Sequence, residues 1–140
     1  MIKVQFEEKY VTCYFDDTIP VLGHEWKGFV NGENMKNTML RMVDIFTELR
    51  KEYPNLTWLG NTTDMSAIAV VYQQWLKEDW PIMMKEKGIN KHALVIPKNM
   101  FAKTAMDKFV EDLTKNHQNI KIRPFHDLES ANEWLKAESC

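Results

Sequence analysis

Three hydroxyl side chains ahead of an expected helix are the first residues in this sequence that could do chemistry. Thr62, Thr63 and Ser66 follow the short apolar segment 56–59, with Asp64 among them. In α/β sheets, ligands usually bind where the carboxyl end of a strand meets the start of a helix, and the free N–H groups there favour phosphate. The simpler interpretation is that Thr63 or Asp64 caps the helix, and capping alone explains this composition.

The second candidate is the apolar segment 75–84. Pro81 interrupts its helical pattern, because proline lacks an N–H and clashes with the preceding turn. A short helix cannot bury every large group of this segment on one face, so some should face an apolar ligand, a membrane or a second copy of the chain. Burial in the core is the competing explanation. The candidate lid or ligand-binding residues are Trp75, Trp80, Ile82, Met83 and Met84.

Histidine and cysteine spacing does not indicate a metal centre or a cofactor. None of the histidines stands at metal-ligand spacing from another histidine or a cysteine, so each is expected to be structural or solvated. The two cysteines are interpreted as reduced thiols. The residues concerned are His24, His92, His117, His126, Cys13 and Cys140.

The motifs of common enzyme classes are also missing from the sequence. It contains neither a glycine-rich phosphate loop nor Gly-x-Ser-x-Gly nor His-Glu-x-x-His. Asp16 and Asp17 follow a strand-like segment as in response-regulator receivers, but an extended segment follows them where a receiver has a helix. The sequence therefore predicts a non-enzymatic protein. An enzyme whose active-site residues are scattered along the chain is a less favoured alternative, behind the two binding roles described below.

Composition limits the remaining classes. The 140 residues suit a single domain over 1–140, with 44% hydrophobic and 27% charged residues. A formal net charge of -2 gives no reason to expect nucleic-acid binding. The first residues lack the apolar stretch of a signal peptide, and no run approaches the roughly 20 apolar residues of a membrane helix. A soluble, cytoplasmic protein is therefore expected.

The apolar pattern predicts an α/β fold with a mixed sheet flanked by helices. Segments 3–7, 10–15 and 19–30 have strand character and are close enough for antiparallel hairpins. Helical and strand patterns then alternate as β-α-β-α-β-α, which favours parallel strands. Helices are expected over 35–49, 67–76, 81–87 and 101–113 and from Asp127 onward, strands over 56–59, 92–96 and 120–122, and a loop over 60–64. Trp58 should be at least partly buried, and the ring of Trp134 should pack on the sheet as the anchor of the last helix.

A series of short motifs resembles the SpoIIAA-like branch of the STAS superfamily over nearly the whole chain. The motifs are Trp26-Lys27-Gly28, Asn61-Thr62-Thr63-Asp64, His92-Ala93, Phe125-x-Asp127 and Ala131-x-x-Trp134-Leu135, with Gly88 ahead of the third. The resemblance implies a mixed sheet with helices packed against it, and it does not imply catalysis.

The resemblance also implies two modes of binding. STAS anti-sigma-factor antagonists bind partner proteins and are phosphorylated on Ser or Thr in an Asp-Ser-rich loop, which corresponds here to 62–66. In this chain Met65 follows Asp64 and no glycine follows Ser66, which departs from that pattern. The SpoIIAA-like branch implies binding of an apolar small molecule, a lipid or a membrane surface, and this is the leading expectation. A regulator of a protein partner, phosphorylated in 62–66, is the alternative.

Overall fold

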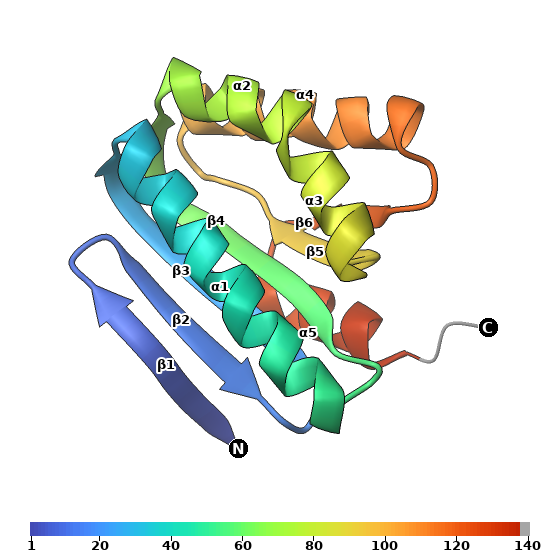
Figure 1. Cartoon of the computed structure of the whole chain (residues 1–140). Coiled ribbons are helices and arrows are strands. Elements are labelled where there is room, and N and C mark those ends of the chain that lie inside the picture. Colours follow the sequence, from blue (N-terminus) through green and yellow to red (C-terminus); the bar gives the residue numbers. More distant parts are fainter. Residues whose placement is uncertain (138–140) are drawn as a thin grey trace.

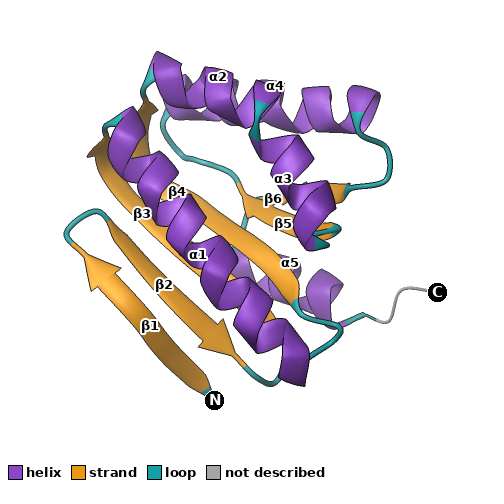
Figure 2. Cartoon of the chain, in the orientation of Figure 1, coloured by secondary structure: helices purple, strands orange, loops and turns teal. Residues whose placement is uncertain are grey.

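The structure is a computed structural model that describes residues 1–137, which fold into six strands and five helices (Figures 1 and 2). The strands are β1 (Ile2–Glu8), β2 (Val11–Asp16), β3 (Val21–Val30), β4 (Thr57–Ile68), β5 (Lys91–Val95) and β6 (Lys121–Phe125). The helices are α1 (Gly32–Glu52), α2 (Val70–Glu78), α3 (Trp80–Lys87), α4 (Met100–Asn116) and α5 (Leu128–Lys136). Cys140 lies outside the described residues.

The strands form one mixed sheet in the order β1-β2-β3-β4-β5-β6. The β1–β2 and β2–β3 pairs are antiparallel, whereas β3–β4, β4–β5 and β5–β6 are parallel. The predicted fold class is therefore confirmed, including the parallel pairing of the strands that contain Leu59 and His92. Because β3, β4 and β5 are parallel, their carboxyl ends lie at the same edge of the sheet.

Helices α1 to α4 cover one face of the sheet, and α5 covers the other (Figures 1 and 2). The larger core lies under α1 to α4 and contains Trp58, which is fully buried as predicted. A smaller core joins α5 to the sheet through Ala131 and Leu135. Trp134 packs its ring against Phe125 of β6, but it is half-buried, so Ala131 and Leu135 are the buried anchors of α5.

The fourth strand is much longer than the sequence predicted. Residues 60–64 were expected to form a loop and residues from 67 a helix, but β4 runs from Thr57 to Ile68 and α2 begins at Val70. The ten-residue strand β3 pairs with β4 as far as Ile68 and supplies it with backbone partners. Tertiary pairing therefore overrides the local turn signal of Asn61 and Asp64. Asp64 lies exposed within the strand and does not cap a helix.

The helix ends that the sequence predicted at Asp127, Gly88 and Pro81 are confirmed. Asp127 caps α5, since its carboxylate accepts a 2.7 Å hydrogen bond from the backbone N–H of Ser130. Gly88 ends α3 with φ of 73°, in the left-handed region that favours glycine. The helix break at Pro81 is present as well, because α2 ends at Glu78 and proline stands in the first turn of α3.

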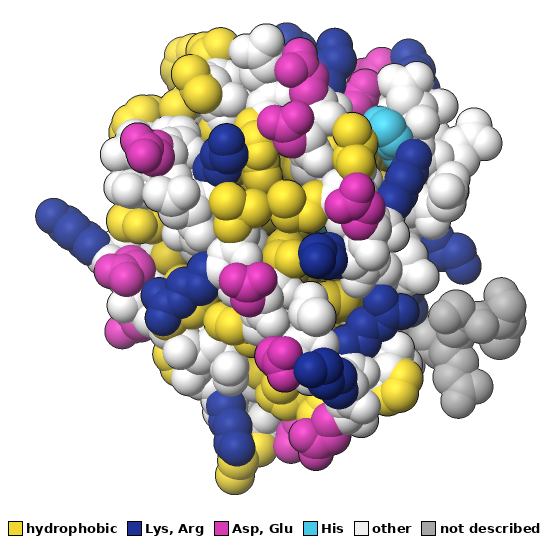
Figure 3. Space-filling view, in the orientation of Figure 1, with side chains coloured by type: hydrophobic (Ala, Val, Ile, Leu, Met, Phe, Trp, Pro, Cys, Tyr) yellow, Lys and Arg dark blue, Asp and Glu magenta, His cyan; other side chains and the backbone are white. Residues whose placement is uncertain are grey.

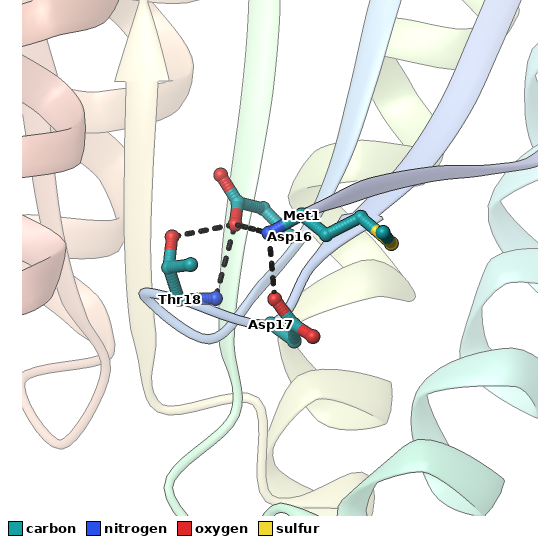
Figure 4. A network of polar contacts seen from close by, with 4 residues as sticks. All are labelled: Met1, Asp16, Asp17 and Thr18. Carbon is teal, nitrogen blue, oxygen red and sulfur yellow. Dashed lines mark hydrogen bonds and ion pairs between the residues drawn. The ribbon is translucent and has the colours of Figure 1, made fainter.

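The acidic pair Asp16 and Asp17 lies in the turn after β2 and binds the chain's amino terminus (Figure 4). The ammonium group of Met1 donates to Asp17 at 2.8 Å, which raises the pKa of the ammonium. Burial raises the pKa of Asp16, but hydrogen bonds from the hydroxyl and backbone N–H of Thr18 outweigh it and lower the pKa overall. This pair therefore holds a turn and an edge strand in place.

Candidate functional site

The structure divides the candidate segment 75–84 between core and surface. Trp75, Trp80 and Met84 are buried in the larger core, and Trp80 is 0% exposed. Met83 is half-buried against the same core, and Ile82 is 56% exposed. Ile82 is therefore the residue of this set that is available for contact with a ligand, a membrane or another protein in this conformation.

The hydroxyls of segment 62–66 neither form the phosphate site considered for a helix start nor cap a helix, because they lie within β4. Thr62 is buried, and its hydroxyl donates to the carbonyl oxygen of Val95 at 2.6 Å. Thr63 is half-buried, and its hydroxyl donates to Oδ1 of Asn61 at 2.6 Å. Ser66 is exposed, as is Asp64.

A cluster of exposed apolar side chains lies at the edge where the parallel strands end. Phe29 is next to the last residue of β3, Val70 and Val71 begin α2 directly after β4, and Met100 and Phe101 begin α4 after β5. Their exposed fractions range from 61% for Phe29 to 83% for Phe101. We call these five residues the apolar rim. Figure 3 shows apolar side chains gathered at the upper left, over the starts of α2 and α4.

Close packing of helix starts brings the rim together. A Cβ on Gly32, the first residue of α1, would lie 3.5 Å from Cβ of Val71 and 3.3 Å from the backbone nitrogen of Tyr72. The small residue therefore lets the start of α1 approach the start of α2. Val70 of α2 and Ala105 of α4 line one open groove of about 810 Å³, so the two helices lie side by side. Most other residues of this groove are charged or carry amides, so the apolar surface is concentrated at the rim.

A second feature is a small cavity of about 20 Å³, lined by buried residues under the helices. His24 of β3 stands opposite Gly60 of β4, and His92 of β5 stands opposite Trp58 of β4, so register brings both histidines to one face. A Cβ on Gly60 would lie 2.9 Å from Cε1 of His24, so the glycine makes room for that ring. The lining residues are His24, Trp26, Met35, Met39, Thr62, Met65, Tyr72, Leu76, Trp80, His92, Leu94, Met106 and Phe109.

Both histidines at the cavity are uncharged at neutral pH. Burial, with a smaller effect of His92, lowers the pKa of His24 to about 3, and burial lowers the pKa of His92 to about 3. Nδ1 of His24 accepts a short hydrogen bond from Nε1 of Trp26. Within residues 1–137, no group of three or more His, Cys, Asp or Glu side chains could hold a metal ion.

The sequence analysis missed both features. Adjacent large apolar residues in the first turns of two helices, Val70 with Val71 and Met100 with Phe101, could have indicated the rim. His24 and His92 are buried. Their meeting at one cavity depends on strand register, which no local pattern in the sequence shows.

Replacing Gly60 by alanine is expected to destabilise the protein by about 1–3 kcal/mol, the usual cost of overpacking a core. The added methyl group would press on His24, whose ring is held by Trp26, and on a methyl of Leu94 at 3.3 Å. Urea unfolding measures the effect, with Ser66→Ala on the same strand as the exposed control. A loss within 0.5 kcal/mol of that control, about the scatter of surface substitutions, would contradict this packing.

A comparison with solved structures found a similar fold in a bacterial protein. Scans found no matching family model and no matching curated protein. That solved structure is described as an uncharacterized protein from the DUF3478 family with a SpoIIAA-like fold from Shewanella loihica PV-4. It is 13% identical to this chain, and the alignment covers 96% of this chain and 92% of that chain with a TM-score of 0.46. Its description names the fold that the sequence resemblance implied.

Proposed function

We propose that this protein is a non-enzymatic module that binds the apolar part of a membrane surface through the apolar rim. The supporting observation is the exposure of five large apolar side chains from three segments at one edge of the sheet. Several large apolar side chains exposed near one edge suggest a site of interaction, whereas single exposed apolar residues need no explanation. No helix among the described residues has the length and apolar character needed to cross a membrane, so the proposed contact is with the surface of the bilayer.

Charge near the rim favours contact by apolar insertion over attraction to anionic lipid. Exposed Lys27 and Lys98 lie near the rim in the chain, but so do exposed Glu33 and Asp64, and Asp64 pairs with Lys27 in the sheet register. Full burial of one such apolar side chain contributes roughly 1.5–3 kcal/mol, so partial insertion of five would contribute several kcal/mol. Binding should therefore occur on uncharged lipid and depend little on salt.

Co-sedimentation with uncharged phosphatidylcholine vesicles tests the rim. We expect the double variant Val71→Ser with Phe101→Ser to bind at least ~10-fold more weakly than the unsubstituted protein, which corresponds to about 1.4 kcal/mol. Ile82→Ser is the matched control, because it removes an exposed apolar side chain from segment 75–84 and leaves the rim intact. Failure of the unsubstituted protein to bind would refute the proposal. An equal loss in Ile82→Ser would move the contact to segment 75–84.

Two related roles predict results in other assays. A carrier of an apolar small molecule would bind a fluorescent fatty-acid analogue without vesicles. A regulator of a protein partner is favoured by the exposed Ser66, since its neighbour Ala67 pairs with Phe29 of the rim in the sheet register. Phosphate on Ser66 would place negative charge near the rim. Intact-mass measurement of the protein from its native cells, with phosphate located on Ser66, would support that role.

A further inference from the structure

The hydrogen bond between Trp26 and His24 fixes the proton on the His24 ring. An indole N–H can only donate, so Nδ1 of His24 must be the acceptor. His24 is neutral, and its single ring proton therefore lies on Nε2. That nitrogen is buried and has no hydrogen-bond partner within residues 1–137. His24 thus presents a fixed donor that no group among the described residues accepts.

Two other residues at the cavity carry buried polar atoms in the same condition. Nε1 of Trp80 and both ring nitrogens of His92 have no partner among the described residues. His24, Trp80 and His92 all line the 20 Å³ cavity. A neutral His92 provides one donor and one acceptor in either tautomer. Buried polar atoms without partners cost about 1–3 kcal/mol each, so a molecule that satisfied several of them would stabilise the fold.

We propose that this cavity is a binding site for one water molecule that bridges His24, Trp80 and His92. A water needs about 10–15 Å³ and two to four polar partners, and the cavity offers the volume and three such residues. The water oxygen accepts hydrogen bonds from the N–H groups of His24 and Trp80. The water donates one hydrogen bond to the unprotonated ring nitrogen of His92. The inference does not depend on the rim or on the proposed function.

The same arrangement excludes ions. A metal cation would meet the N–H groups of His24 and Trp80 in place of lone pairs. An anion would be buried beside neutral donors with no positive charge among the lining residues, and burial of an uncompensated charge is strongly unfavourable. The site is therefore specific for a small uncharged molecule that both accepts and donates hydrogen bonds.

Nuclear magnetic resonance of the ¹⁵N-labelled protein near pH 7.5 tests this site. Long-range ¹H–¹⁵N spectra should show His24 protonated on Nε2, and cross-relaxation spectra should show a long-lived water beside Hε2 of His24 and Hε1 of Trp80. A His24 proton on Nδ1, or no water signal at either hydrogen, would overturn the proposal.

A pair of variants separates the bridging water from other solvent. His92→Leu removes the acceptor and fills the space with apolar atoms, so both water signals should disappear. His126→Leu changes an exposed histidine and should leave them unchanged. Water signals that persist at His24 and Trp80 in a folded His92→Leu protein would also overturn the proposal. If that variant does not fold, the signals of the unsubstituted protein decide the question.

Discussion

Acidification from pH 7 to about 4 is expected to unfold the protein, because two buried histidines must gain protons. The pKa of each is lowered from 6.5 to about 3 in the folded protein. Above pH 6.5 both are neutral whether the chain is folded or unfolded, and the stability is complete. Between pH 6.5 and 3 the unfolded chain binds protons that the folded protein does not, so stability falls as pH falls.

The expected loss is large relative to the stability of a domain. Each histidine contributes a slope of about 1.4 kcal/mol per pH unit in this window. Together they remove about 5 kcal/mol by a pH near 4.5, which is comparable to the total stability of many domains. Protonation of carboxylates such as Asp127, whose pKa is lowered by hydrogen bonds from Ser130, adds to the loss at still lower pH.

Urea unfolding at several pH values between 7.5 and 5 measures this slope. We expect about 2.7 kcal/mol per pH unit well below pH 6.5 for the unsubstituted protein, and about half of that for a folded His92→Leu variant. His126→Leu is the control, because His126 is exposed. A free energy of unfolding that stays constant from pH 7 to 5 would contradict this account, because it would show that the two histidines do not gain protons on unfolding.

Replacing Trp80 with alanine is expected to destabilise the protein by about 3–5 kcal/mol, the usual cost of truncating a buried tryptophan. Its ring is fully buried between Trp58 and Trp75, with ring centroids 5.4 and 5.5 Å apart. The substitution also leaves a cavity in the larger core, into which α3 packs through Trp80 and Met84.

Trp134→Ala is the matched comparison, and it should cost roughly half as much or less, because its ring is half-buried. The ring contacts Phe125 at a centroid distance of 5.7 Å, and Nζ of Lys91 lies 4.9 Å from its centroid. Chemical denaturation measures both variants under identical conditions. An equal loss for the two, or a loss below about 1 kcal/mol for Trp80→Ala, would contradict the burial described here.

The fold could be predicted from the sequence because its main signals are local. Alternating helical and strand patterns gave the order of elements, and Asp127, Gly88 and Pro81 marked helix ends correctly. The length of β4 could not be predicted, since its second half is held by pairing with β3 and not by its own residues. The half-burial of Trp134 likewise depends on how α5 packs on its face of the sheet.

The candidate sites were harder to predict because exposure and register are tertiary properties. Segment 75–84 has the composition of a binding surface, but the core under α1 to α4 takes up Trp75, Trp80 and Met84. The apolar rim includes the first residues of α2 and α4, two helices that lie side by side although β5 ends opposite Asn61 and β4 continues to Ile68. His24 and His92 line one cavity because strand register brings them to the same face, and Gly60 makes room for the His24 ring.

The most direct test of membrane binding through the rim is lipid quenching of a tryptophan placed there. Trp26, Trp58 and Trp80 are fully buried, Trp75 is nearly so, and the half-buried Trp134 lies in α5 on the other face of the sheet. Phe101→Trp would therefore add an exposed reporter at the rim, with the unsubstituted protein as the background. With vesicles of brominated phosphatidylcholine, we expect its emission to shift to shorter wavelength and to be quenched, while an Ile82→Trp control changes little. An unchanged Phe101→Trp spectrum at saturating lipid, with the protein folded, would contradict the proposed function.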